Sequence, residues 1–131
     1  MDFEKSFHPF ADLLGFEITQ CSNGESVCSV EHHIKLNNTN QVVHGGVIYS
    51  LADTGMGAAL FSMLEKGERC ATIEIKITYF RPSGPHKLVC ESRVLKKGKR
   101  VAMTESDVYC NGELVAKATG SFAMFSMPRD I

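Results

Sequence analysis

The chain lacks a large net charge, a leader-like start and a paired cysteine motif. Each absence argues against a class of protein. The sequence holds 14 Lys and Arg against 15 Asp and Glu, a formal net charge of -1 at pH 7. This balance argues against a general nucleic-acid-binding protein, because such proteins carry an excess of basic side chains. The start, Met-Asp-Phe-Glu-Lys, lacks the basic segment followed by an apolar one that marks a secretory signal.

The cysteines are odd in number, and no two of them are spaced as C-x-x-C. They are Cys21, Cys28, Cys70, Cys90 and Cys110. A disulfide framework and a structural zinc site are therefore not expected. Reduced thiols in a cytoplasmic protein are the simplest interpretation, and we expect no metal ion.

One long apolar stretch is present, from Val47 to Leu64, and it is about long enough to cross a bilayer. It contains Ser50, Asp53, Thr54 and two glycines, which favours a buried helix over a membrane span. No contact with a membrane is expected.

Apolar periodicity and turn signals predict the other elements. Pro9 and Gly15 bound a short helix over Phe7–Leu14. Strands are expected on either side of the turn at residues 22–25, and a polar loop from Lys35 to Val43 leads into the long helix. The predicted strands are Phe16–Cys21, Ser26–Ile34, Ala71–Tyr79, Lys87–Leu95, Arg100–Tyr109 and Leu114–Phe125.

This order of elements predicts one α+β domain. Successive hairpins build an antiparallel sheet, while a helix that is apolar nearly all round needs covering on most sides. A strongly curved sheet wrapped around that helix, completed by a partner subunit, is the hotdog fold. We expect residues 1–131 to form a single such domain, with an N-terminal arm over 1–12 and a loose tail over 126–131.

The most informative residue is Asp53, a lone carboxylate inside the apolar stretch. A chain keeps a charge in such a setting mainly when the charge is paired or functional. His44, Gly45 and Gly46 stand directly before the helix, where free backbone N–H groups can hold an anion or a polarised carbonyl. The combination suggests acyl chemistry.

The spacing of His44 and Asp53 carries a further consequence. Nine residues of helix place them roughly 180° apart around the axis and roughly 13 Å apart along it. The two side chains cannot reach one small reacting group within one chain. If both serve one site, the carboxylate comes from one subunit and the helix tip from another, across a twofold interface. A homodimer is the minimum assembly.

Several motifs together resemble the PaaI-like hotdog acyl-CoA thioesterases. They are Asn38-x5-His44-Gly45-Gly46-x6-Asp53, Ala71-Thr72-Ile73-Glu74 and Ile77-Thr78-Tyr79-Phe80-Arg81-Pro82. The likeness runs from about Leu13 to Phe125, and its specific part is the His-Gly-Gly with an Asp nine residues after the His.

The resemblance implies a role for each matching residue. The N–H of Gly45 or Gly46 would polarise the thioester carbonyl, and Asn38 and His44 would orient the tip and the thioester. Asp53 of the opposite subunit would act as nucleophile or as general base. Thr72 would help to hold the water or the Asp.

The resemblance also implies an acyl-CoA substrate, with coenzyme A as part of substrate and product and no other cofactor. Hotdog dimers commonly pair, so a homotetramer is expected. Two segments match regions that contact coenzyme A in the family, in addition to Gly46. Their residues are Tyr79, Phe80, Arg81, Pro82, Ser83 and Gly84, and Lys96, Lys97, Gly98, Lys99, Arg100 and Val101.

Other interpretations stay open at this point. Asp53 and His44 are each compatible with a purely structural role, and the basic residues 96–100 with a solvated hairpin. A hotdog module that binds acyl-CoA without hydrolysing it would keep the helix-tip pocket but need no carboxylate. A hotdog acyl-thioester dehydratase would need a different motif layout. The sequence does not indicate which acyl group the substrate carries.

Overall fold

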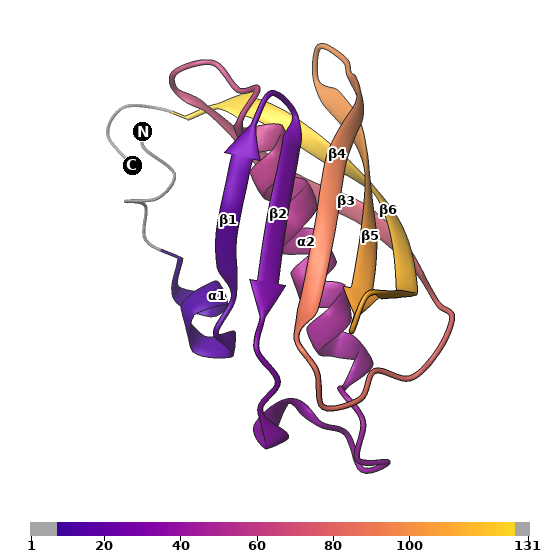
Figure 1. The fold of residues 1–131 in the computed structure, drawn as a ribbon. Helices are drawn as coiled ribbons and strands as arrows, with labels where there is room; N and C mark the ends of the chain where they lie inside the picture. Colours follow the sequence, from indigo (N-terminus) through magenta and orange to yellow (C-terminus); the bar gives the residue numbers. More distant parts are fainter. Residues whose placement is uncertain (1–7, 128–131) are drawn as a thin grey trace.

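A six-stranded antiparallel sheet wraps around one long helix in the computed structural model, which describes residues 8–127 (Figure 1). The strand order is β1-β2-β4-β5-β6-β3. The predicted hotdog architecture is confirmed. The elements are α1 (Pro9–Leu14), β1 (Glu17–Ser22), β2 (Glu25–Val30), the short 3-10 helix η2 (Ile34–Leu36), α2 (Gly45–Phe61), β3 (Glu68–Tyr79), β4 (Leu88–Lys97), β5 (Val101–Cys110) and β6 (Glu113–Ser126).

Local chemistry sets the first elements. Pro9 begins α1, and Gly15 ends it in the left-handed region at φ +83°, a conformation that glycine adopts without steric cost. Asn23 and Gly24 both have positive φ in the β1–β2 turn, as the tight turn of a twisted hairpin requires. The predicted helix start at Phe7 lies outside the described residues.

The second strand is shorter than predicted. It ends at Val30, which pairs with Leu88, the first residue of β4, so the chain beyond Val30 has no ladder partner there. His33 then accepts a hydrogen bond from the Lys35 N–H through Nδ1 at 3.0 Å, and this local bond starts η2 instead. Ile34, predicted inside the strand, is 76 % exposed.

The long helix is also shorter than predicted, because it ends at Phe61 rather than Leu64. Ser62 donates from its hydroxyl to the carbonyl of Ala59 at 2.7 Å and accepts from the Gly24 N–H at 2.8 Å. These bonds tie the end of α2 to the β1–β2 turn. No helix among residues 8–127 is long and apolar enough to cross a membrane.

One face of α2 lies directly on the central strands. A Cβ at Gly55 would come within 2.5 Å of Ser92 Oγ and 2.9 Å of Cys90 Sγ, so only glycine fits there. The Ser26 hydroxyl donates to the Gly55 carbonyl at 2.6 Å. Asp53 precedes Gly55 by two residues, about 200° around the helix, so its side chain leaves on the side away from these strands.

Strand β3 forms one edge of the sheet and carries a bulge that the sequence pattern did not reveal. The alternation of residue types predicts Ile73 on the buried side and Thr72 on the exposed side. The register shifts between Thr72 and Glu74, and a bulge reverses the alternation of faces. As a result Ile73 is 57 % exposed. Thr72 is also exposed, as predicted, and pairs with Phe122 while its hydroxyl reaches Asp53 on the helix.

The sheet's last strand runs into the predicted tail. β6 continues through Ser126, and the Met127 N–H then donates to the Gly67 carbonyl at 3.2 Å. The rest of the predicted tail, residues 128–131, lies outside the described residues, as do residues 1–7 of the predicted arm. Residues 9–12 of that arm belong to α1.

Candidate active site

His44 caps the N-terminus of α2 with its own ring. Its Nδ1 accepts a hydrogen bond from the Gly46 N–H at 2.8 Å. An accepting Nδ1 carries no proton, so the neutral ring holds its hydrogen on Nε2, where it is a donor. The Gly45 N–H has no hydrogen-bond partner among residues 8–127. Of the two glycines, Gly45 is therefore the one whose amide is available to a ligand.

The tip of α2 is held from three directions. The Tyr79 hydroxyl donates to the Gly45 carbonyl at 2.7 Å, the His44 N–H donates to the Leu36 carbonyl at 2.8 Å, and the Val43 N–H donates to the Ser83 carbonyl at 3.0 Å. A Cβ at Gly45 would lie 3.3 Å from the Tyr79 ring. These contacts fix the direction of the free Gly45 amide, as an oxyanion site requires.

Asn38 shapes the loop that leads to the tip. Its Oδ1 accepts from the Asn40 N–H at 2.8 Å and more weakly from the Val42 N–H at 3.4 Å. Its own N–H donates to the Val42 carbonyl at 2.8 Å. The side-chain oxygen is thus engaged within the loop that leads to the helix tip.

Asp53 and Thr72 meet between α2 and β3. The Thr72 hydroxyl donates to Asp53 Oδ1 at 2.8 Å, a contact made possible by the bulge in β3. Burial raises the pKa of Asp53 above the ordinary Asp value, and the Thr72 hydrogen bond acts in the opposite direction. A half-buried carboxylate with a raised pKa is a better proton acceptor than a solvated one.

A cavity of about 300 Å³ opens beside Asp53. The Cys70 thiol lies in its wall, with a pKa raised by burial and by the charge of Asp53. None of the residues from Asn38 to Gly46 lines the cavity, so one chain does not bring its helix tip to its own carboxylate. The lining residues are His8, Asp53, Thr54, Gly57, Ala58, Phe61, Arg69, Cys70, Ala71, Thr72 and Phe122.

Replacing Thr72 with valine tests the Asp53 contact. Valine keeps the shape but removes the donor that favours the ionised carboxylate, so the pKa of Asp53 rises further. If Asp53 must be ionised to react, the acidic limb of the kcat/KM profile moves to higher pH in Thr72→Val, while Thr72→Ser keeps the wild-type profile. A pH profile over the acidic and neutral range measures this, and identical limbs in all three proteins would remove Thr72 from the site.

The first predicted coenzyme A segment runs past the helix tip. Besides the bond that Tyr79 donates and the one that the Ser83 carbonyl accepts, Arg81 forms an ion pair with Glu113. Phe80 is 53 % exposed. Ser83 differs from its neighbours, because its side chain is buried and its hydroxyl has no partner among residues 8–127. Within this segment the Tyr79 ring contacts Gly45, so a ligand at the Gly45 amide would lie next to Tyr79.

The second predicted segment, residues 96–101, lies at the other end of the molecule. It forms the β4–β5 hairpin, where the Gly98 N–H donates to the Val101 carbonyl at 2.9 Å. Figure 1 shows this hairpin at the top, whereas α2 begins at the bottom. The basic side chains at 96, 97, 99 and 100 form no ion pair with residues 8–127. One chain therefore does not bring both segments to one helix tip.

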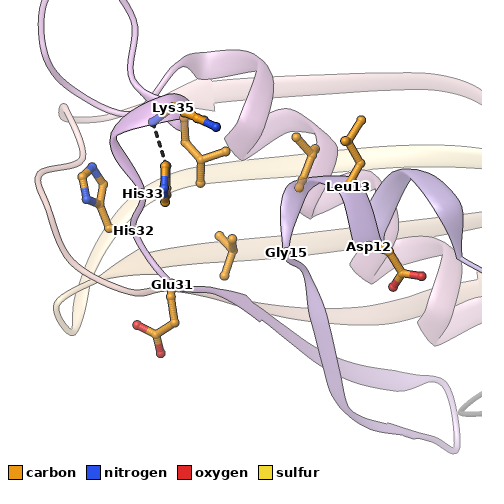
Figure 2. A pocket seen from close by; sticks show the side chains of 10 residues that line it. Asp12, Leu13, Gly15, Glu31, His32, His33 and Lys35 are labelled. Carbon is orange, nitrogen blue, oxygen red and sulfur yellow. Dashed lines mark hydrogen bonds between the residues drawn. The ribbon is translucent and has the colours of Figure 1, made fainter.

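A second cavity, of about 390 Å³, lies between α1 and the segment after β2 (Figure 2). Leu14, Val30 and Leu36 contribute apolar surface, and Asp12 and Lys35 are among its charged residues. It contains none of the residues predicted for the site. No group of three or more His, Cys, Asp or Glu in the described part of the chain is arranged to hold a metal ion.

Comparison with known proteins assigns the family. The sequence profile of the Thioesterase superfamily matches residues 40–117, well over half of the chain and the part that carries the helix tip, Asp53 and Thr72. The chain belongs to the thioesterase superfamily. The predicted PaaI-like hotdog thioesterase family is thereby confirmed.

Relatives of known structure or name span nearly the whole chain. The conserved protein PA5202 from Pseudomonas aeruginosa has a TM-score of 0.90 at 30 % identity, covering 95 % of this chain and 100 % of that one. A mutant form of the phenylacetic acid degradation protein PaaI from Thermus thermophilus has a TM-score of 0.82 at 26 % identity, covering 88 % and 98 %. The medium/long-chain acyl-CoA thioesterase YigI of Salmonella typhimurium is 25 % identical over 87 % of this chain and 84 % of its own length.

Sequence reasoning missed two features of the site. The pattern grouped Tyr79 with the coenzyme A contacts, which stays a prediction, but did not reveal that its hydroxyl donates to the Gly45 carbonyl across 34 positions of sequence. The β3 bulge, which turns Thr72 toward Asp53, was also missed. Neither has a local signal, because each depends on pairing with a distant segment.

Proposed function

We propose that this chain is an acyl-CoA thioesterase whose reaction centre is shared by two subunits. The observation that carries the proposal is the separation of two complementary halves. One half is the free Gly45 amide at the positive end of α2. The other is the half-buried Asp53 held by Thr72 beside a cavity. Neither half is a complete reaction centre by itself. A twofold dimer brings the two halves together at two equivalent sites.

The geometry of such a dimer follows from symmetry. If Asp53 of one chain meets the Gly45 tip of its partner, the twofold axis places the partner's Asp53 at the first chain's tip. The two α2 helices must then lie antiparallel. Homodimer formation is part of this proposal, and the pairing of dimers into tetramers stays a prediction.

Each group then has a chemical task. The Gly45 N–H and the Nε2–H of His44 donate to the thioester oxygen, and the negative charge that develops there is stabilised by the helix end. Asp53 of the other chain removes a proton from water as the water oxygen attacks the carbonyl carbon. The C–S bond breaks, and the proton passes from Asp53 to the coenzyme A sulfur. Direct attack by Asp53, with hydrolysis of the resulting anhydride, uses the same atoms.

The antiparallel helices also account for the two coenzyme A segments. They lie at opposite ends of one protomer (Figure 1), so an antiparallel pair brings residues 79–84 of one chain toward residues 96–101 of the other. The hairpin's Lys and Arg side chains suit the phosphates of coenzyme A. The name of YigI, an acyl-CoA thioesterase, supports this substrate class.

A panel of acyl-CoA thioesters tests the proposed activity. We expect the wild-type protein to release coenzyme A catalytically from at least one of acetyl-, butyryl-, octanoyl-, palmitoyl-, benzoyl- and phenylacetyl-CoA, measured by a colorimetric thiol assay. Chromatography should find the free acid in equal amount. Saturable binding of acyl-CoA with no product over hours would instead identify a binding module.

A further inference from the structure

Of the five residues of α2 that line the Asp53 cavity, three lie in a single row. Asp53, Gly57 and Phe61 are spaced by four, so they lie one above the other on one helix face, and all three border the cavity. Cys70 lines the cavity from β3 and Phe122 from β6. The cavity therefore extends from the carboxylate toward the C-terminal end of α2.

The middle of that row is open because Gly57 has no side chain. A Cβ built there meets only the Phe122 ring, at 3.8 Å, which is ordinary van der Waals contact. The contrast with Gly55, two residues earlier, is sharp, because a Cβ there would overlap Ser92 and Cys90. Packing against the sheet requires glycine at 55. No residue among 8–127 packs closely enough to require glycine at 57, where the missing side chain leaves the space to the cavity.

We propose that the acyl group of the substrate lies in this cavity and that Gly57 sets the largest acyl group accepted. This inference rests on the proposed thioesterase function. A thioester carbonyl placed beside Asp53 carries the acyl chain on one side and coenzyme A on the other. The cavity suits the acyl chain. Its walls at Gly57, Phe61 and Phe122 are apolar, so an acyl chain fits along this row, while Arg69 is a cationic side chain elsewhere in the lining.

The volume indicates the class of acyl group. A liquid-water molecule occupies about 30 Å³, so the cavity of about 300 Å³ accommodates on the order of ten heavy atoms. A medium-length chain or a single ring with a short arm fills it. An acetyl group leaves most of it empty, and a palmitoyl chain exceeds it. Gly57 determines this limit because a side chain there would divide the cavity between Asp53 and Phe61.

Leucine at position 57 tests the inference. We expect Gly57→Leu to lower kcat/KM for octanoyl- and phenylacetyl-CoA by at least ~10-fold, while the value for acetyl-CoA changes by less than about threefold. Gly57→Ala should fall between the two proteins. Alanine fits without overlap and favours helix, so this variant keeps its fold. Leu13→Phe, in the cavity of Figure 2, is the matched control and should keep the wild-type preference.

A binding measurement separates this inference from the proposed function. S-octyl-CoA and S-ethyl-CoA are thioethers that cannot be hydrolysed, and calorimetry gives their Kd values. Wild type should bind the octyl form more tightly, and Gly57→Leu should lose that preference. If wild type hydrolyses thioesters but Gly57→Leu keeps the wild-type chain-length preference in Kd and in kcat/KM, the Gly57 inference is wrong and the activity stands. In the reverse result, Gly57→Leu loses the chain-length preference in Kd but the wild-type protein hydrolyses no thioester. That result would contradict the proposed activity and support the acyl-binding cavity.

Discussion

Asp53→Ala lowers kcat by at least ~10²-fold on whichever acyl-CoA the wild-type protein hydrolyses best, which is the loss expected when a positioned acid–base group is removed. The reason is that no other carboxylate lines the cavity among the described residues. The Thr72 hydroxyl alone does not accept a proton at neutral pH. We expect KM to change much less than kcat, because the cavity walls remain. Steady-state rates by thiol release measure both.

The fold of this variant is not at risk from the lost charge. Burial raises the pKa of Asp53, so the folded state disfavours the ionised form. Ionised Asp53 thus reduces stability as the pH rises through the folded pKa, and neutral replacements relieve this cost. Asp53→Asn keeps the size of the side chain and should be as inactive as Asp53→Ala. Unfolding curves at neutral pH should show both at least as stable as wild type.

Asp12→Asn is the matched control for this experiment. Asp12 is a carboxylate in the other cavity, the one drawn in Figure 2, and takes no part in the proposed site. Its variant should keep the wild-type kcat. A fully active Asp53→Ala protein would contradict the mechanism. An inactive Asp12→Asn protein would indicate that the cavity of Figure 2 takes part in the activity.

Much of the fold was predictable because its signals are local. Pro9 and Gly15 bound α1, Asn23 and Gly24 set the first hairpin, and the lone long apolar stretch becomes the central helix. The hotdog arrangement followed from one helix that needed covering and a series of hairpins. These features depend on residues close together in sequence, so they could be read before any contact was known.

Other features depend on contacts that the sequence does not display. The end of β2 is set by where β4 begins, and the exposure of Ile73 by a bulge relative to β6. The same holds for the site. The spacing of His44 and Asp53 predicted that the helix tip and the carboxylate lie apart within one chain. Only the structure shows that the Gly46 N–H donates to the His44 ring, which leaves the Gly45 N–H available.

The shared reaction centre predicts a specific behaviour of mixed subunits. Alanine at Asp53 removes the carboxylate, and alanine at His44 removes the cap and its Nε2–H donor. Each homodimer is then defective at both sites. A dimer of one chain of each kind combines both defects in one site and leaves the other complete, because the intact tip comes from the Asp53→Ala chain and the intact carboxylate from the His44→Ala chain. Restored activity therefore requires a site that spans both chains.

The most direct test is the activity of the two variants refolded together. With random pairing, half of the dimers are mixed and each has one intact site, so the mixture should recover about a quarter of the wild-type rate per chain. Each variant refolded alone should stay near background. A mixture no more active than the average of its two components would show that each chain builds its own site, and would contradict the account.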